Sequence, residues 1–331
     1  MRRVAVVAAV AAVLLTGCSS TGGGDELQVV EDPVAAVAAT SPSPQREPAG
    51  TVLAQRGEVT AMATAGRTLA VALAEPPSVL LYDLDAPRAK AVSVPLPSAV
   101  EELTAHGDEV LATLPRSGEV ARIAVPSGTV RTVPVRGRPA GVAVGEDGRL
   151  LVAVRDRKAV EVLEGGRVTK TITSDLYSAD DVLTTGGRAV VLDRLRTAVF
   201  DVDVEQGTVN EGLRAGMGAT NAVVDSFGRV LVADTRGGGL LAFSTDPLLL
   251  RQRYPVAGGI YGIAYDARRH LAWVTLTGRN EVVGFDVRGG EPTEKYRLPT
   301  VRQPNSVTVD EQTSRVVIGS AAGEGIQVIT P

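Results

Sequence analysis

Hydrophobic and polar positions alternate in short runs from residue 51 to the end of the chain. Runs of about four to seven Val, Leu and Ala residues are separated by turns rich in Gly, Pro, Asp and Asn. No long segment carries an apolar stripe with helical spacing, and short runs of this composition favour β-strands. The pattern therefore predicts an all-β domain over residues 49–331.

One motif recurs along this domain: a turn, usually a basic residue, and then an apolar strand. Examples are "AGRTLAVAL", "DGRLLVAVR" and "FGRVLVADT". The aligned positions in the seven copies are Leu69, Val110, Leu150, Ala189, Val230, Leu271 and Val316. Their spacings are 41, 40, 39, 41, 41 and 45 residues. A period of about 40 residues is typical of repeat architectures such as β-propellers.

A single repeat, residues 140–172, divides into four strands near residues 141–144, 150–154, 159–163 and 168–172. The first hairpin contains "GEDG", whose glycines can adopt the positive φ of a tight turn. Seven antiparallel four-stranded units predict a seven-bladed β-propeller. Six or eight blades would require a miscounted repeat.

The last repeat has only three strands before the chain ends at Pro331. Residues 51–55, "TVLAQ", precede the first innermost strand and could supply the missing outermost strand of the last blade. Pairing the two ends of the domain would close the ring and remove a free sheet edge.

The stretches "ATNAVVDSFGRVLVADTRGGGLLAF", "NSVTVDEQTSRVVIGS" and "GRNEVVGFDV" resemble repeats of the NHL and YVTN type of bacterial propeller. The resemblance covers residues 51–331 and implies a fold. WD repeats are a poor match, because the sole tryptophan, Trp273, lies inside a strand. Related propellers include lactonases, lyases, quinoprotein-like domains and binding scaffolds, so the fold does not settle the function.

The first residues have the parts of a secretion signal: a basic start at Arg2 and Arg3 and an apolar run over residues 4–15. The run is shorter than the roughly 20 residues of a membrane-spanning helix. Residues 15–18, "LTGC", resemble the bacterial lipobox. This resemblance implies that Cys18 receives a diacylglycerol and that residues 1–17 are removed. The alternative is an ordinary signal peptide with an accidental cysteine.

Small residues, prolines and scattered charges without a regular period follow Cys18 as far as residue 48. We predict a flexible tether over residues 18–48, with a short helix at "DPVAAVAA" that packs on the domain as the alternative. Together these features predict an exported lipoprotein on the outer face of the bacterial cytoplasmic membrane. The export route stays open.

Removal of residues 1–17 takes away Arg2 and Arg3 and changes the formal charge from -4 to -6. An acidic surface argues against nucleic acid as a partner. Because Cys18 is the only cysteine, no intramolecular disulfide can form. We expect a monomer whose partners are the membrane, through the lipid, and a protein or glycan.

Known catalytic signatures are missing from the sequence. It has no Gly-x-Ser-x-Gly elbow, no phosphate-binding Gly-rich loop and no cysteine pair for zinc. The two histidines, His106 and His270, fall at hairpins between the first and second strands of a blade. These hairpins lie opposite the usual ligand funnel, which predicts surface turn residues. Catalytic residues stay unassigned.

Polar residues recur where the innermost strands begin, on the expected funnel face. Counting from the aligned positions places Thr60, Glu101, Gly141, Asp180, Asn221, Gly262 and Ser306 at equivalent sites. Their neighbours include Glu102, Asp181, Tyr261 and Asn305, and the second strands end at Asp193 and Asp234. These side chains are therefore candidates for lining the funnel or its rim.

Carboxylate and amide oxygens are ligands of hard cations, so Ca²⁺ is a possible cofactor held by Glu101, Asp180 and Asn221. Gluconolactonase-like propellers use such a set, which the sequence matches in residue type only. Alternatively, these side chains bond loop backbone groups or face water in the channel.

Three classes of function follow from these features. We favour an anchored binding or scaffold module for a protein, peptide or glycan, because no convincing catalytic set is present. The alternative is a metal-assisted hydrolase of the lactonase or gluconolactonase type. A structural stabiliser of an envelope complex is the third.

Overall fold

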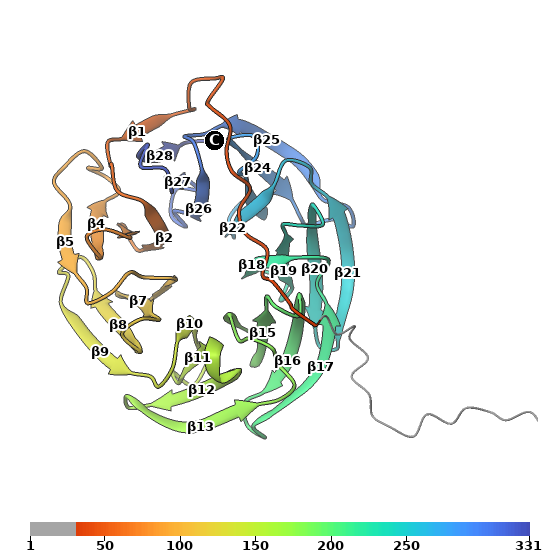
Figure 1. The fold of residues 1–331 in the computed structure, drawn as a ribbon. Coiled ribbons are helices and arrows are strands. Elements are labelled where there is room, and N and C mark those ends of the chain that lie inside the picture. Colours follow the sequence, from red (N-terminus) through yellow and green to blue (C-terminus); the bar gives the residue numbers. More distant parts are fainter. Residues whose placement is uncertain (1–30) are drawn as a thin grey trace, which may run out of the picture.

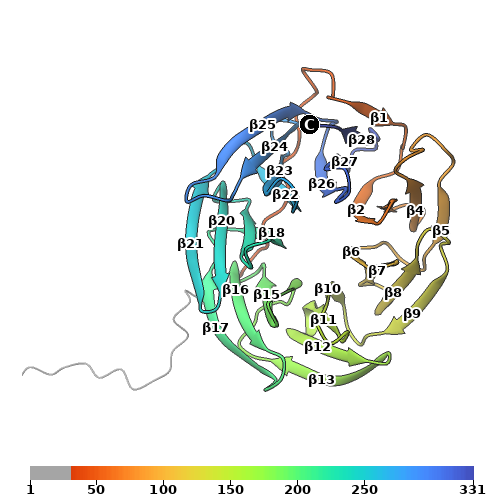
Figure 2. The same cartoon turned by 180° about the vertical axis from the view of Figure 1, so that it is seen from behind.

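The computed structural model describes residues 31–331. The predicted signal peptide, Cys18 and the first part of the predicted tether lie outside the described residues. Residues 51–331 form seven four-stranded antiparallel sheets, arranged as blades around a central axis (Figures 1 and 2). The seven-bladed β-propeller predicted from the repeat is thus confirmed. Among the described residues, no helix is long and apolar enough to cross a membrane.

In blades 1 to 6 the chain runs from the innermost to the outermost strand. Blade 1 contains β2 (Val59–Ala65), β3 (Thr68–Leu73), β4 (Ser78–Asp83) and β5 (Val92–Pro95). Blade 2 contains β6 (Leu103–His106), β7 (Glu109–Leu114), β8 (Glu119–Ala124) and β9 (Val130–Pro134). Blade 3 contains β10 (Pro139–Val144), β11 (Leu150–Val154), β12 (Ala159–Glu164) and β13 (Arg167–Thr173), with a 3₁₀ turn, η1 (Arg155–Arg157), between β11 and β12.

Blade 4 contains β14 (Asp181–Thr185), β15 (Arg188–Asp193), β16 (Ala198–Asp203) and β17 (Thr208–Arg214). Blade 5 contains β18 (Ala219–Val224), β19 (Val230–Asp234), β20 (Gly239–Thr245) and β21 (Leu248–Pro255). Blade 6 contains β22 (Ile260–Asp266), β23 (Leu271–Leu276), β24 (Glu281–Asp286) and β25 (Thr293–Pro299). Blade 7 contains β26 (Pro304–Val309), β27 (Val316–Ser320), β28 (Ile326–Ile329) and β1 (Thr51–Leu53).

The ring closes as the sequence predicts, because β1 pairs antiparallel with β28 and completes blade 7. The fully buried amide of Gln327 reinforces this closure. Its Nε2 donates to the backbone oxygens of Ala49, at 2.7 Å, and Pro299, at 3.0 Å. Its Oε1 accepts the backbone N–H of Val301 at 3.0 Å. One side chain thus joins the start of the domain to blades 6 and 7.

The core lies between neighbouring blades, where apolar side chains of facing sheets meet. In blade 6, the fully buried Trp273 on β23 pairs with Gly284 on β24 and stacks on Tyr296, with ring centroids 5.4 Å apart. A Cβ on Gly284 would lie 3.0 Å from the indole ring. The ring therefore occupies the space that a side chain at position 284 would need.

The segment of residues 34–46, here called the strap, has no regular secondary structure and lies on the propeller (Figure 1). It passes over the ends of β22 and β18 on one face of the ring. The hydroxyl of Ser41 donates to the backbone oxygen of Thr277 at 2.6 Å, and Gln303 Nε2 donates to Ala39 O at 3.0 Å. The sequence predicted a flexible tether or a short helix here. Partners far away in the sequence hold the strap extended instead.

Candidate functional site

A channel of about 1050 Å³ runs along the innermost strands of all seven blades. Its wall includes residues from the funnel face, where these strands begin, and from the opposite face, where they turn back. Ten of the predicted candidates line it, and six of these have no carboxylate: Thr60, Asn221, Tyr261, Gly262, Asn305 and Ser306. Glu101, Glu102, Asp180 and Asp181 line it as well. The channel is large enough for a small ligand or part of a larger partner.

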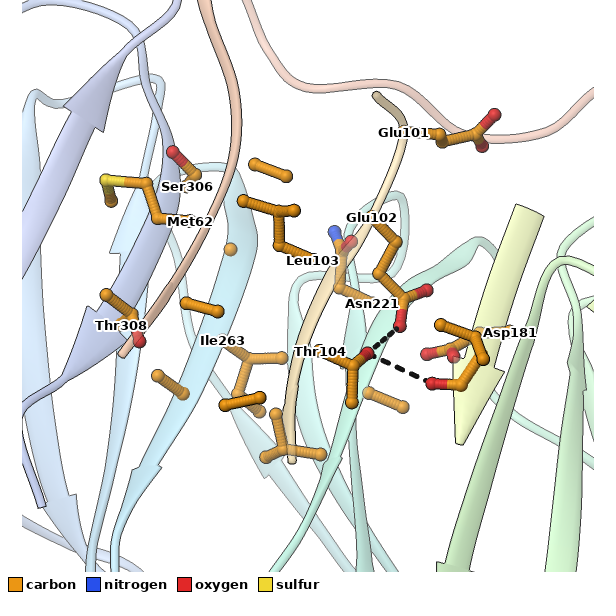
Figure 3. Close-up of a pocket in the computed structure, with 18 of the residues that line it drawn as sticks. Met62, Glu101, Glu102, Leu103, Thr104, Asp181, Asn221, Ile263, Ser306 and Thr308 are labelled. Atoms are coloured by element: carbon orange, nitrogen blue, oxygen red, sulfur yellow. Dashed lines mark hydrogen bonds between the residues drawn. The ribbon is translucent and has the colours of Figure 1, made fainter. Parts of the chain in front are cut away.

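Two carboxyl groups of the channel wall meet across a glycine. Glu102 precedes β6 in blade 2, Asp181 begins β14 in blade 4, and their side chains lie next to each other (Figure 3). Gly141 of blade 3 lies between them. A Cβ on Gly141 would lie 2.8 Å from Asp181 Oδ1 and 3.0 Å from Glu102 Oε2. The absence of a side chain at Gly141 thus leaves room for the two carboxyls to meet.

A difference in the length of the first hairpin explains why counting along the sequence missed this level by one residue in blade 4. Gly141 pairs with Ala153, three residues beyond the aligned position in its second strand. In blade 4, the residue paired with the equivalent Leu192 is Asp181, not Asp180. Val144 pairs with Leu150 across five turn residues in blade 3, whereas Thr185 pairs with Arg188 across two in blade 4. Equivalence by spacing alone assumes first hairpins of equal length.

Burial raises the pKa of both carboxyls. For Glu102, desolvation is the largest cause and the negative charge of Asp181 adds to it. Desolvation likewise raises the pKa of Asp181, to about 7, although its hydrogen bonds oppose the shift. Because both pKa values are raised, the pair keeps a proton to higher pH than two isolated carboxyls would. The Thr104 hydroxyl, 2.9 Å from Glu102 Oε1 and 3.0 Å from Val142 O, supports the pair (Figure 3).

Arg155, in the η1 turn after β11, links two other candidate carboxylates. Its Nε donates to Asp180 Oδ1 at 2.6 Å, and its Nη1 and Nη2 both bond the Glu101 carboxylate. Asp180 also accepts the backbone N–H of Arg194 at 2.8 Å and the hydroxyl of Ser178. Both carboxylates are therefore already compensated by protein groups.

Asp193 and Asp234, expected at the rim, are fully buried and do not line the channel. Asp193 Oδ2 accepts the backbone N–H of Tyr177 at 2.6 Å. Asp234 Oδ1 accepts those of Met217 and Gly218 at 3.0 and 2.8 Å. The two carboxylates therefore hold loops in place by accepting hydrogen bonds from their backbone N–H groups. This was the alternative interpretation of the sequence.

The geometry does not favour a calcium site at the three predicted ligands. Glu101 and Asp180 pair with Arg155, and Asn221 Nδ2 donates to Tyr261 O at 3.0 Å. In the described part of the chain, no group of three or more His, Cys, Asp or Glu is arranged to hold a metal ion. A cation at Glu101 and Asp180 would have to compete with a guanidinium that bonds both.

Both histidines lie at first hairpins, on the face where the sequence placed them. His106 ends β6 and lines the far end of the channel. His270 Nδ1 lies 3.1 Å from the Tyr265 hydroxyl, and its ring is 5.3 Å from that of Phe227. Neither approaches the carboxyl pair as an ion-pair or hydrogen-bond partner in the described structure.

Sequence reasoning missed the two arginines, Arg155 and Arg194, that organise the funnel face. Both follow second strands, in loops that the repeat assigns to this face. That position, next to several acidic residues, was the available signal. The partner of each arginine depends on contacts between blades, which the spacing of one repeat does not specify.

Solved structures similar to this chain share its propeller fold. A structure of hydrazine synthase from Kuenenia stuttgartiensis is 17% identical, with a TM-score of 0.72 over 85% of this chain and 97% of that one. A structure of virginiamycin B lyase from Staphylococcus aureus is 14% identical, with a TM-score of 0.72 over 85% and 98%. A chain of a mitotic checkpoint complex is 12% identical, with a TM-score of 0.73 over 92% and 98%.

Identities this low establish the fold alone, and the three proteins differ in function. No family model and no curated relative matches the chain. The resemblance to NHL and YVTN repeats therefore stays a prediction.

Proposed function

We propose that the chain is an envelope-anchored lipoprotein whose β-propeller is a binding or scaffold module for a protein, peptide or glycan. The lipid on Cys18 would hold it at the outer face of the bacterial cytoplasmic membrane. One observation carries the binding assignment: the wide channel is accessible, whereas most of its charged candidates are bonded to other protein groups. Such a wall can bind a partner through its shape and through hydrogen bonds, and it presents few unpaired charged groups that could take part in a reaction.

Crosslinking in cells tests the binding assignment. A photoreactive benzoylphenylalanine replaces Tyr261, which lines the channel, and in a control it replaces Val168, 43% exposed on the outermost strand of blade 3. We expect a discrete adduct from position 261 only. Filling the channel with Thr308→Trp should remove that adduct without changing the melting temperature. An adduct of equal yield from position 168, or one that survives Thr308→Trp, would count against a channel partner.

Fractionation tests the anchor separately. Wild-type protein should partition with membranes and Cys18→Ser should not. Equal partitioning of both would contradict lipidation at Cys18.

The alternative of a metal-assisted hydrolase has support from the Glu102–Asp181 pair. Two close carboxyls that share a proton can exchange it for a cation, which could polarise a substrate carbonyl. This version places the cation one residue along from the predicted Glu101 and Asp180. It requires that a metal ion raises the melting temperature of the wild-type protein and that Glu102→Gln and Asp181→Asn each abolish this rise.

A further inference from the structure

The strap turns apolar side chains outward at the rim of the funnel face. Val34 and Val37 are 72% and 74% exposed, and Met217, in the loop before β18, is 55% exposed. Arg236 joins the two segments, because its guanidinium donates to Val34 O at 2.9 Å and to Met217 O at 3.1 Å. Val34, Val37 and Met217 are hereafter called the rim patch.

The inward side of the strap fixes the position of the patch. Ala36 is 5% exposed, and its backbone oxygen accepts a hydrogen bond from Arg194 Nη2 at 3.1 Å. A Cβ on Gly218 would lie 2.8 Å from the Ala36 methyl, so only glycine admits this approach. The exposed valines are therefore presented by a segment that is bonded on its other side.

The charges around the patch are mixed, with arginines on the propeller itself. Arg236 and Arg279 are exposed in equivalent loops between the second and third strands of blades 5 and 6. Glu31 and Asp32 are exposed where the described chain begins. Apolar side chains flanked by arginines suit the interface of an anionic bilayer, where the arginines meet lipid headgroups.

The length of chain before the patch favours the membrane as its occupant. Thirteen residue steps separate Cys18 from Glu31 (31 minus 18). Even fully extended, that segment reaches about 45 Å at most. A lipid on Cys18 would therefore keep a bilayer within reach of the patch at high effective concentration.

We propose that the rim patch docks on the anionic membrane surface that holds the N-terminal lipid. This proposal rests on the proposed lipidation of Cys18. Docking turns the funnel rim of blades 5 and 6 toward the bilayer and leaves the opposite face, marked by His106, open to the exterior. A partner then reaches the channel from that opposite face.

Fluorescence of the full lipidated chain in vesicles tests this orientation. An environment-sensitive thiol label is placed through Val37→Cys, or through Val168→Cys as the matched exposed control on β13. The vesicles contain phosphatidylglycerol, phosphatidylcholine and a nitroxide-bearing lipid. We expect the label at position 37 to shift to shorter wavelength and be quenched by the nitroxide, and the label at position 168 to do neither. Raising the salt to 1 M, where the Debye length falls to about 3 Å, should weaken the quenching.

Equal quenching at both positions, or none at position 37 of a vesicle-bound chain, would overturn docking while leaving the anchor intact. Reaction of the wild-type protein with the thiol label would show a free Cys18 sulfur. That result would overturn the anchor, and the docking proposal with it.

Discussion

Glu102 and Asp181 belong to blades 2 and 4, yet their carboxyls lie next to each other across Gly141 of blade 3. The contact is possible because innermost strands converge on the axis and because one blade contributes no side chain at this level. Among the channel residues that the structure describes, these are the two neighbouring carboxyls whose pKa values are both raised.

Gly141→Ala should destabilise the fold by about 1 to 3 kcal/mol, the usual cost of overpacking a buried site. The new Cβ would lie 2.6 Å from the Asp181 Cα, and backbone cannot move aside as a flexible side chain would. Urea denaturation measures the difference. Gly289→Ala is the control, since a Cβ there meets nothing within 4 Å. Equal midpoints for the two variants would contradict the close packing at Gly141.

Neutralising the pair should change how stability depends on pH. A carboxyl whose pKa is raised in the folded state stabilises the fold below its unfolded pKa. That contribution is lost as the pH rises through the folded pKa, about 7 for Asp181. Asp181→Asn should therefore gain stability relative to wild type between about pH 4 and pH 7. Unfolding midpoints at several pH values give the comparison.

Asp286→Asn is a control variant, for which the stability difference from wild type should depend on pH in the opposite direction. Hydrogen bonds from Arg288 lower the pKa of Asp286 to about 2, so its contribution is present above the unfolded pKa and fades as the pH falls toward 2. This variant should lose stability at neutral pH and approach wild type in acid. A pH-independent difference for Asp181→Asn would show that the pair holds no proton.

Arg155→Gln should lower the free energy of unfolding by about 1 to 3 kcal/mol, because the nearly buried Asp180 carboxylate would lose a charged partner. Asp180→Asn should cost more than Glu101→Gln, since the Glu101 side chain is 32% exposed and water can replace the arginine there. Thermal unfolding ranks the variants. Arg116→Gln, at an exposed position, should stay within about 0.5 kcal/mol of wild type. Equal losses of stability for Asp180→Asn and Glu101→Gln would contradict the prediction that the more buried carboxylate depends more on its arginine.

Loosening the strap should expose it to trypsin at Arg46. Ser41→Ala removes the hydroxyl that bonds Thr277 O and the Gln303 N–H, and each net hydrogen bond is worth about 0.5 to 1.5 kcal/mol. Cleavage from the opened state should accelerate roughly two- to tenfold per bond. Ser43→Ala, at an exposed strap position, should leave the rate unchanged. Equal cleavage of all three proteins would mean that Ser41 does not hold the strap.

The sequence was sufficient for the blade architecture but not for the pairing of charges. Spacings near 40 residues and the three-stranded last repeat predicted seven blades and the β1–β28 closure, because both depend on local strand patterns. Arg155 meets Glu101 and Asp180 only through the packing of three blades. The strap has no period of its own, and its order depends on distant partners such as Gln303. Neither contact leaves a signal in a single sequence.

The central claim is that the channel binds a partner without assembling a metal-dependent reaction site. Thermal unfolding of the wild-type protein in EDTA and then in excess calcium, beside Glu102→Gln and Asp181→Asn, tests it most directly. A site filled at 100 times its dissociation constant would stabilise the fold by about 2.7 kcal/mol. We predict the same melting temperature for each protein in both conditions. A calcium-dependent rise of several degrees that both variants abolish would contradict the claim and make esters and lactones the next substrates to test.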